Sequence, residues 1–208
     1  MKKIRLSIFT ALAVMALQTA YGQAQVALGI KGGLNFANVS TKSVGAAYNS
    51  RTGYHAGAFL LLKFAKFGLQ PEVIYSQQGT TVRFNSQNFD SNFSYVNIPI
   101  IFKLYLVGGL NLQAGPQFGF LTKATGINGY NAITGQPTTG DIKNYYKGSD
   151  ISIGLGAGWD LPFGLNIDAR YNLGVSDNNN SSASGTSDAV KNQVFQLSAG
   201  FKLFKFGN

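Results

Sequence analysis

The chain has 208 residues, no cysteine and a formal net charge of +9, from 17 lysines and arginines against 8 aspartates and glutamates. The lack of cysteine excludes a disulfide framework, and one histidine without cysteine cannot supply the usual ligands of a zinc site. No run of basic residues is interleaved with aromatic residues, so the composition does not indicate a nucleic-acid-binding protein.

The first 22 residues have the three parts of a secretory signal peptide. They are basic residues at positions 2, 3 and 5, an apolar run over 6–17, and the small-x-small motif Ala20-Tyr21-Gly22. The apolar run is shorter than the ~20 residues that a membrane-spanning helix needs. We therefore expect a signal peptide over 1–22, with cleavage after Gly22 or, alternatively, after Ala24, and one mature domain over 23–208.

Eight stretches then alternate apolar and polar residues with a period of two, which predicts strands with one apolar and one polar face. The stretches are 26–38, 54–64, 67–83, 95–106, 110–120, 151–161, 165–173 and 195–203. Prolines at positions 71, 99 and 116 each remove a donor from the predicted ladder, so we expect β-bulges there.

The polar breaks between these stretches alternate between long and short. The long breaks are 39–53, 84–94, 123–149 and 176–192, and the short ones are 65–66, 107–109 and 162–163. Short periplasmic turns and long outer loops are typical of bacterial outer-membrane barrels. The sequence thus predicts an all-β, eight-stranded, antiparallel up-and-down transmembrane β-barrel in a Gram-negative outer membrane, with both termini in the periplasm.

A soluble antiparallel sheet would also alternate, but the predicted strands exceed the usual globular length of ~5–6 residues. Aromatic residues also gather near both ends of the strands, as in the girdles of membrane barrels. They include Phe64, Phe67, Trp159 and Phe206 near the turns, and Phe36, Tyr75, Phe120 and Tyr171 at the opposite ends.

Several segments resemble the outer-membrane β-barrel domain proteins of Bacteroidetes, often labelled porin-family or PorT-family. They are Gly32–Asn35, Gly53–Gly57, Leu69–Gly79, Tyr95–Pro99, Ala114–Gln117 and Asp168–Gly174. The resemblance implies a barrel fold and no catalytic residues, and PorT-like proteins imply a role in type IX secretion. The aromatic-rich end at 201–206 is similar to the strand signal that the outer-membrane assembly machinery reads, although Gly207 and Asn208 follow it.

Charged residues recur on the polar faces of the strands and are expected inside the narrow barrel. They are Lys31, Lys63, Glu72, Lys103, Asp160, Asp168, Arg170 and Lys202. Because an isolated buried charge is costly and an eight-stranded lumen is filled by its side chains, we predict a stabilising polar network. Glu72 and Arg170 are the predicted pair, and the alternative is a gated ion path.

Two further features could carry function. His55 lies near the outer end of its strand, where a serine and a carboxylate would have to complete a hydrolase triad, but no nucleophile motif is present, so we expect a structural histidine. The long break 123–149 contains Tyr130, Tyr145 and Tyr146, which are candidate contacts for a binding partner. The alternative is a solvated loop.

The sequence therefore predicts a non-enzymatic outer-membrane protein with an envelope role, loops available for binding, and no cofactor or metal. Expected partners are outer-membrane lipid and lipopolysaccharide, the assembly machinery during insertion, and a secretion-system or extracellular partner. The alternatives are a narrow porin, a type IX secretion accessory protein, a soluble lipocalin-like carrier with an apolar ligand inside, and a lipid-modifying hydrolase.

Overall fold

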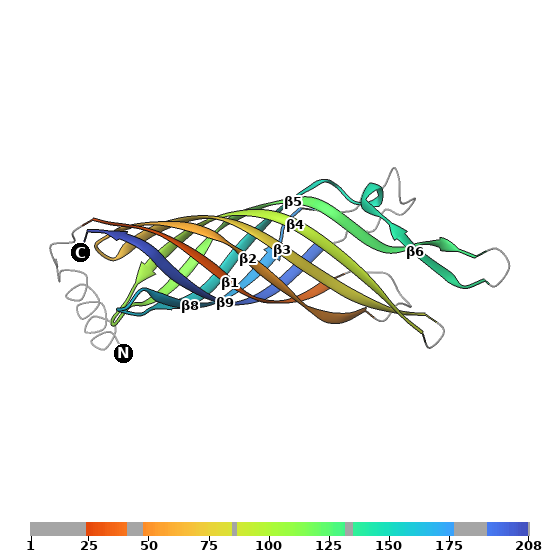
Figure 1. Cartoon of the computed structure of the whole chain (residues 1–208), viewed down its shortest axis with the longest axis horizontal. Coiled ribbons are helices and arrows are strands. Elements are labelled where there is room, and N and C mark those ends of the chain that lie inside the picture. The colour runs from red at the N-terminus through yellow and green to blue at the C-terminus, as the bar shows by residue number, and fades with distance from the viewer. Residues whose placement is uncertain (1–23, 41–47, 85–86, 132–134, 177–190, 208) are drawn as a thin grey trace, which may run out of the picture.

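The computed structural model describes residues 24–40, 48–84, 87–131, 135–176 and 191–207. These residues form strands and one short 3-10 helix (Figure 1). In chain order the elements are β1 (Gln25–Ser40), β2 (Tyr48–Phe64), β3 (Phe67–Phe84), β4 (Gln87–Tyr105), β5 (Leu110–Tyr130), β6 (Pro137–Asp141), η1 (Lys143–Tyr145), β7 (Ser149–Asp160), β8 (Leu165–Gly174) and β9 (Lys191–Phe206). No helix in the described ranges is long and apolar enough to cross a membrane.

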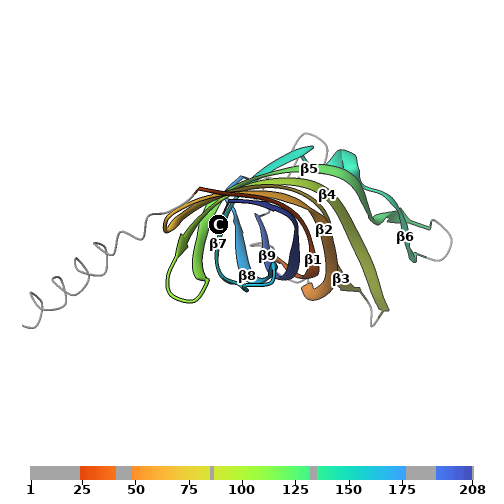
Figure 2. The same cartoon turned by 60° about the vertical axis from the view of Figure 1, so that its left-hand side comes forward.

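Eight of the described strands close into an antiparallel barrel. Their order is β4-β3-β2-β1-β9-β8-β7-β5, and a further pairing of β4 with β5 completes the ring. Figure 2 shows the strands curving around one interior. The short β6 pairs antiparallel with the outer part of β5 and belongs to the connection between β5 and β7. The predicted eight-stranded up-and-down barrel is confirmed.

The first and last strands meet at the end of the barrel that carries the short turns. β1 pairs with β9 from Val26 and Phe206 onward, and the C-terminus lies at that end (Figure 1). The predicted turns at 65–66, 107–109 and 162–163 separate the strands there. Gly109 takes a positive φ of 85°, which a residue without a side chain adopts most readily.

The apolar faces of the strands point outward and the polar faces point into the barrel. β7 shows the strict alternation, with Ile151, Ile153 and Leu155 exposed and Ser152 buried. Exposed apolar residues at every second position are what a lipid-facing barrel requires. The alternative of a lipocalin-like carrier with an apolar ligand inside is wrong, because polar and charged side chains occupy most of the interior.

Several strands extend further than the alternation predicts. The predicted loop 84–94 is mostly strand, since β4 begins at Gln87 and its register with β3 continues through the pair Arg83 and Asn88. β2 likewise begins at Tyr48 rather than near 54, and β5 continues to Tyr130. The outer ends of these strands have no strict apolar alternation, because a strand that leaves the membrane needs no apolar face.

The expected bulges at the three prolines are wrong. The register of β3 with β4 is the same on both sides of Pro71, and that of β4 with β5 is the same on both sides of Pro99. Pro116 pairs with Ile153 without a register shift. Each proline therefore removes a donor while the neighbouring strand keeps its alignment. The register shifts occur elsewhere, for example beside Tyr95 in β4.

Candidate functional site

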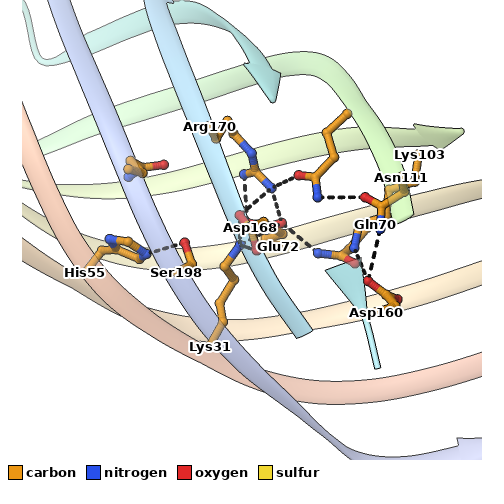
Figure 3. Close-up of polar contacts among 12 residues, drawn as sticks. Lys31, His55, Gln70, Glu72, Lys103, Asn111, Asp160, Asp168, Arg170 and Ser198 are labelled. Carbon is orange, nitrogen blue, oxygen red and sulfur yellow. Dashed lines mark hydrogen bonds and ion pairs between the residues drawn. The ribbon is translucent and has the colours of Figure 1, made fainter. Parts of the chain in front are cut away.

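Four charged side chains from three strands meet in the middle of the lumen (Figure 3). Arg170 donates to both carboxylate oxygens of Glu72, with Nη2–Oε1 and Nη1–Oε2 distances of 2.9 and 3.2 Å. Lys31 Nζ lies 3.1 Å from Asp168 Oδ2 and 3.5 Å from Glu72 Oε1. All four side chains are at most 3% exposed. We call these residues the central cluster; its two cations and two anions balance.

Two neutral amides contact the central cluster. Gln70 Nε2 donates to Glu72 Oε1 over 2.8 Å, and Gln113 Oε1 accepts from Arg170 Nη2 over 3.0 Å. Gly154 on β7 leaves room for the arginine, because a Cβ there would lie 3.1 Å from Arg170 Cδ. Bidentate arginine–carboxylate pairs are among the strongest polar contacts in proteins.

A second charged group lies nearer the short turns, where Asp160 ends β7. Lys202 Nζ lies 2.8 Å from Asp160 Oδ2, and Lys103 Nζ lies 3.3 Å from Asp160 Oδ1. The Tyr105 hydroxyl and the Asn111 amide also donate to this carboxylate, over 3.0 and 3.2 Å. We call these five residues the periplasmic-end cluster, a name that follows the expected membrane orientation.

Seven of the eight predicted lumen residues lie in these two clusters, which are connected because Gln113 accepts from Arg170 and donates to Asn111, and Asn111 donates to Asp160. The predicted partners Glu72 and Arg170 are in direct contact. Lys63 differs from the others, because its Nζ lies 4.2 Å above the ring centroid of Tyr105, a cation–π contact at the end of the barrel. Which charged side chains come into contact depends on the tilt and stagger of the strands. The alternation of residues within one strand does not reveal either of them.

His55 joins a third polar group in the outer half of the lumen. Its Nδ1 lies 2.8 Å from Asn35 Oδ1 and its Nε2 lies 2.9 Å from Ser198 Oγ. Asn35 Nδ2 faces three acceptors: Tyr54 O, Ser76 Oγ and Gln77 O. Because these acceptors fix the amide, Oδ1 must accept from His55 Nδ1–H, which leaves Nε2 to accept the serine proton.

This serine–histidine–asparagine arrangement has the hydrogen-bond order of a nucleophile, a base and an orienting group. The carboxylate expected for a triad is replaced by an amide. Asn35, His55 and Ser198 are 0%, 3% and 5% exposed, so an ester in the surrounding lipid or solvent does not reach the hydroxyl. Sequence reasoning did not identify Ser198 as the histidine's partner, because 143 residues separate the two.

Two clusters of buried apolar side chains also contribute to the interior of the barrel. Near the short turns, Ala27, Phe59 and Leu61 form a buried cluster. The alternation in β2 already implies that Phe59 and Leu61 face inward, and Phe59 fills the space beside Gly29, where a Cβ would lie 2.4 Å from Cζ. At the outer end a second buried cluster, which we call the outer cap, consists of Phe93, Tyr95, Leu121, Ala124 and Ile142.

The long connection between β5 and β7 supplies Ile142 to the outer cap. Ile142 N donates to Ala124 O over 3.1 Å. Tyr146 packs edge-on against Phe93 with 5.0 Å between ring centroids, so it anchors the connection. Tyr145 is exposed, whereas the side chain of Tyr130 lies outside the described part of the chain. No group of three or more acidic, histidine or cysteine side chains that could hold a metal ion occurs in the described ranges.

The comparisons with known proteins agree with this geometry. The family model described as "Outer membrane protein beta-barrel domain" matches residues 18–180. The crystal structure of Neisserial surface protein A has a TM-score of 0.54 at 13% identity, covering 85% of this chain and 97% of that chain. No curated protein sequence gives a significant match.

Two other solved barrels are similar at lower scores. Ail of Yersinia pestis, crystallised with the heparin analogue sucrose octasulfate, has a TM-score of 0.46 at 18% identity, covering 89% of this chain and 99% of that one. OprG from Pseudomonas aeruginosa has a TM-score of 0.41 at 12% identity, covering 89% and 96%. At these identities the likenesses concern the fold alone.

A closed barrel with an apolar outer face and a charged, tightly hydrogen-bonded lumen defines the class of small outer-membrane β-barrel proteins. The family match covers most of the barrel. The chain therefore belongs to the outer membrane protein beta-barrel domain family and is an outer-membrane protein.

Proposed function

We propose that this protein is a non-enzymatic envelope protein whose closed barrel holds an outer connection in place for binding. The observation that supports it best is the central cluster, where Arg170 and Glu72 span the lumen with both side chains nearly fully buried. The outer cap and the buried cluster of Ala27, Phe59 and Leu61 add apolar side chains to this interior. Such an interior favours a rigid support over a narrow porin.

The surface offered for binding is the connection between β5 and β7. Figure 1 shows β5 and β6 extending beyond the barrel at the end opposite the C-terminus. Ile142 and Tyr146 hold this connection against the barrel, while Lys143 and Tyr145 between them remain exposed. Tyrosine beside lysine is a suitable contact surface for a polar or anionic partner such as lipopolysaccharide.

The orientation is part of the proposal. The end with the short turns and both termini would face the periplasm, as in other outer-membrane barrels. The outer-membrane assembly machinery would then insert the barrel, reading the aromatic-rich end of β9 that includes Phe201 and Phe204.

Planar-bilayer recording of the detergent-refolded protein tests the closed lumen, with folding checked by heat-shifted gel migration. We expect no stable channels from the wild-type protein. The Glu72→Ala variant removes one side of the central cluster and serves as the sensitive comparison. Regular wild-type channels whose conductance changes in this variant would instead establish a small porin.

The second candidate is a PorT-like accessory protein of type IX secretion in Bacteroidetes. The segments that carry this resemblance include Leu69–Gly79 and Asp168–Gly174, which supply Glu72, Asp168 and Arg170 to the central cluster. The segments that carry the resemblance therefore contain three of the four residues of the central cluster, which fills the lumen. Affinity purification of the tagged protein from its native membrane tests this second candidate function, because other secretion proteins co-purify only with a component of the secretion system.

A further inference from the structure

A small polar cavity lies in the outer half of the lumen, between the outer cap and the hydrogen-bonded group around Asn35. Tyr95 of the outer cap lines it, together with Asn97, Asp150, Ser152 and Asn172. The space for the centre of a water-sized molecule is about 10 Å³. This volume is near the lower limit for one water molecule and excludes an organic ligand.

Three residues that line the cavity carry side-chain atoms without a hydrogen-bond partner within the described part of the chain. These atoms are Asn97 Nδ2, Ser152 Oγ and Asn172 Oδ1. The three residues are 2%, 4% and 3% exposed and come from β4, β7 and β8. Buried polar atoms are almost always paired in folded proteins, so three orphaned atoms around one cavity indicate a common partner.

The chemistry of the three atoms selects that partner. Asn172 Nδ2 donates to Gln196 Oε1 over 2.8 Å, which turns the amide so that Oδ1 remains as an acceptor. Asn97 Nδ2 is a donor, and the Ser152 hydroxyl can donate or accept. A bare cation would leave the Asn97 donor unpaired, and an anion would leave the Asn172 acceptor unpaired and lie beside Asp150.

We infer that the cavity is a binding site for one ordered water molecule. It accepts from Asn97 Nδ2, donates to Asn172 Oδ1 and bonds Ser152 Oγ, and so joins β4, β7 and β8 across the lumen. Through Asn172 and Gln196 it continues to Asn35, which accepts from Gln196 Nε2 over 2.9 Å. The water completes a polar layer directly beneath the outer cap and goes beyond the proposed binding role of the protein.

Two substitutions at Ser152 give results of opposite sign for a hydrated and a dry cavity. Ser152→Val places two methyl groups in the space, whereas Ser152→Ala leaves it open. With a bound water, valine displaces it and leaves the Asn97 and Asn172 atoms unpaired. We expect the unfolding equilibrium constant of the valine variant to be about tenfold or more higher than that of the alanine variant, so that the valine variant is the less stable of the two.

The measurement is urea unfolding in phospholipid vesicles, followed by the fluorescence of Trp159, the single tryptophan of the chain. A valine variant more stable than the alanine variant would mean that methyl groups fill a dry cavity, and would overturn the inference. Heat-shifted gel migration verifies that both variants fold.

A crystal structure of the wild-type protein gives an answer that does not depend on either variant. We expect one density peak at hydrogen-bonding distances of about 2.7–3.2 Å from the three atoms. A cavity without density would contradict the inference. So would a peak that gains anomalous signal when the crystal is soaked in rubidium chloride, because it would identify a monovalent cation.

Discussion

Arg170 on β8 and Glu72 on β3 form a two-bond fork across the interior of the barrel, with N–O distances of 2.9 and 3.2 Å. The two strands are not neighbours in the barrel, since β7 and β9 flank β8 while β2 and β4 flank β3. The contact therefore ties opposite walls together rather than adjacent strands. It fills the lumen and sets how far the walls can separate.

Removing Glu72 should destabilise the barrel strongly. Glu72→Ala leaves Arg170 and Lys31 buried with only Asp168 as a carboxylate partner. Breaking a buried ion pair by deleting one partner typically costs about 3–5 kcal/mol, and we expect a value near the lower end because Asp168 remains. Urea unfolding in phospholipid vesicles measures the change.

The matched control replaces both partners together, as Glu72→Leu with Arg170→Met. Apolar side chains of similar size avoid the unpaired charge, so the double variant should be more stable than Glu72→Ala. If Glu72→Ala were as stable as the wild-type protein, this would show that water already screens the charges of the central cluster.

The periplasmic-end cluster should depend on Asp160 in the same way. Asp160→Ala leaves the cations of Lys103 and Lys202 facing each other, and removes the acceptor of the Tyr105 hydroxyl. Hydrogen bonds to charged groups contribute about 1.5–3 kcal/mol each, so we expect a loss of at least this size. The free energy of unfolding is compared with that of Lys205→Ala, an exposed lysine nearby, which should change little. Equal losses in both variants would refute the role of Asp160.

The barrel could be predicted from the sequence because lipid imposes an apolar residue at every second position of a membrane strand. This alternation ends where a strand leaves the membrane. The sequence therefore predicts a loop at 87–94, where the structure has the first part of β4. The contact between Glu72 and Arg170 could be predicted because charged side chains that face inward need partners of opposite charge. The contacts of His55 with Asn35 and Ser198 could not be predicted, because the tilt and stagger of the strands bring residues that are distant in sequence to the same level of the barrel.

Asn35 should matter more for stability than Ser198, although both contact His55. Asn35 Oδ1 contacts His55 and Gln196, and Asn35 Nδ2 faces Ser76 and two backbone carbonyls. The Ser198 hydroxyl, in contrast, contacts the imidazole of His55. Each buried group left unpaired costs about 1–3 kcal/mol. We therefore expect Asn35→Ala to lower the unfolding midpoint in urea well below that of Ser198→Ala. A larger effect of Ser198→Ala would point to a role of the serine beyond structure.

The outer cap should control how tightly the connection between β5 and β7 is held. Ile142→Asp introduces a carboxylate among the buried apolar side chains of Phe93, Leu121 and Ala124. Loss of the buried isoleucine alone costs about 2–5 kcal/mol, which is enough to accelerate local opening at least about tenfold. The barrel strands contribute most of the fold and should remain intact.

Limited trypsin digestion of whole cells measures this opening, because Lys143 lies next to Ile142 in the connection and is exposed. We expect the Ile142→Asp variant to be cleaved at least about tenfold faster than the wild-type protein. Thr139→Asp, an exposed position on β6, is the control and should be cleaved at the wild-type rate. Equal rates for the Ile142 variant and the wild-type protein would mean that contacts other than the outer cap hold the connection. Cleavage only after the outer membrane is opened would place this end of the barrel in the periplasm and reverse the proposed orientation.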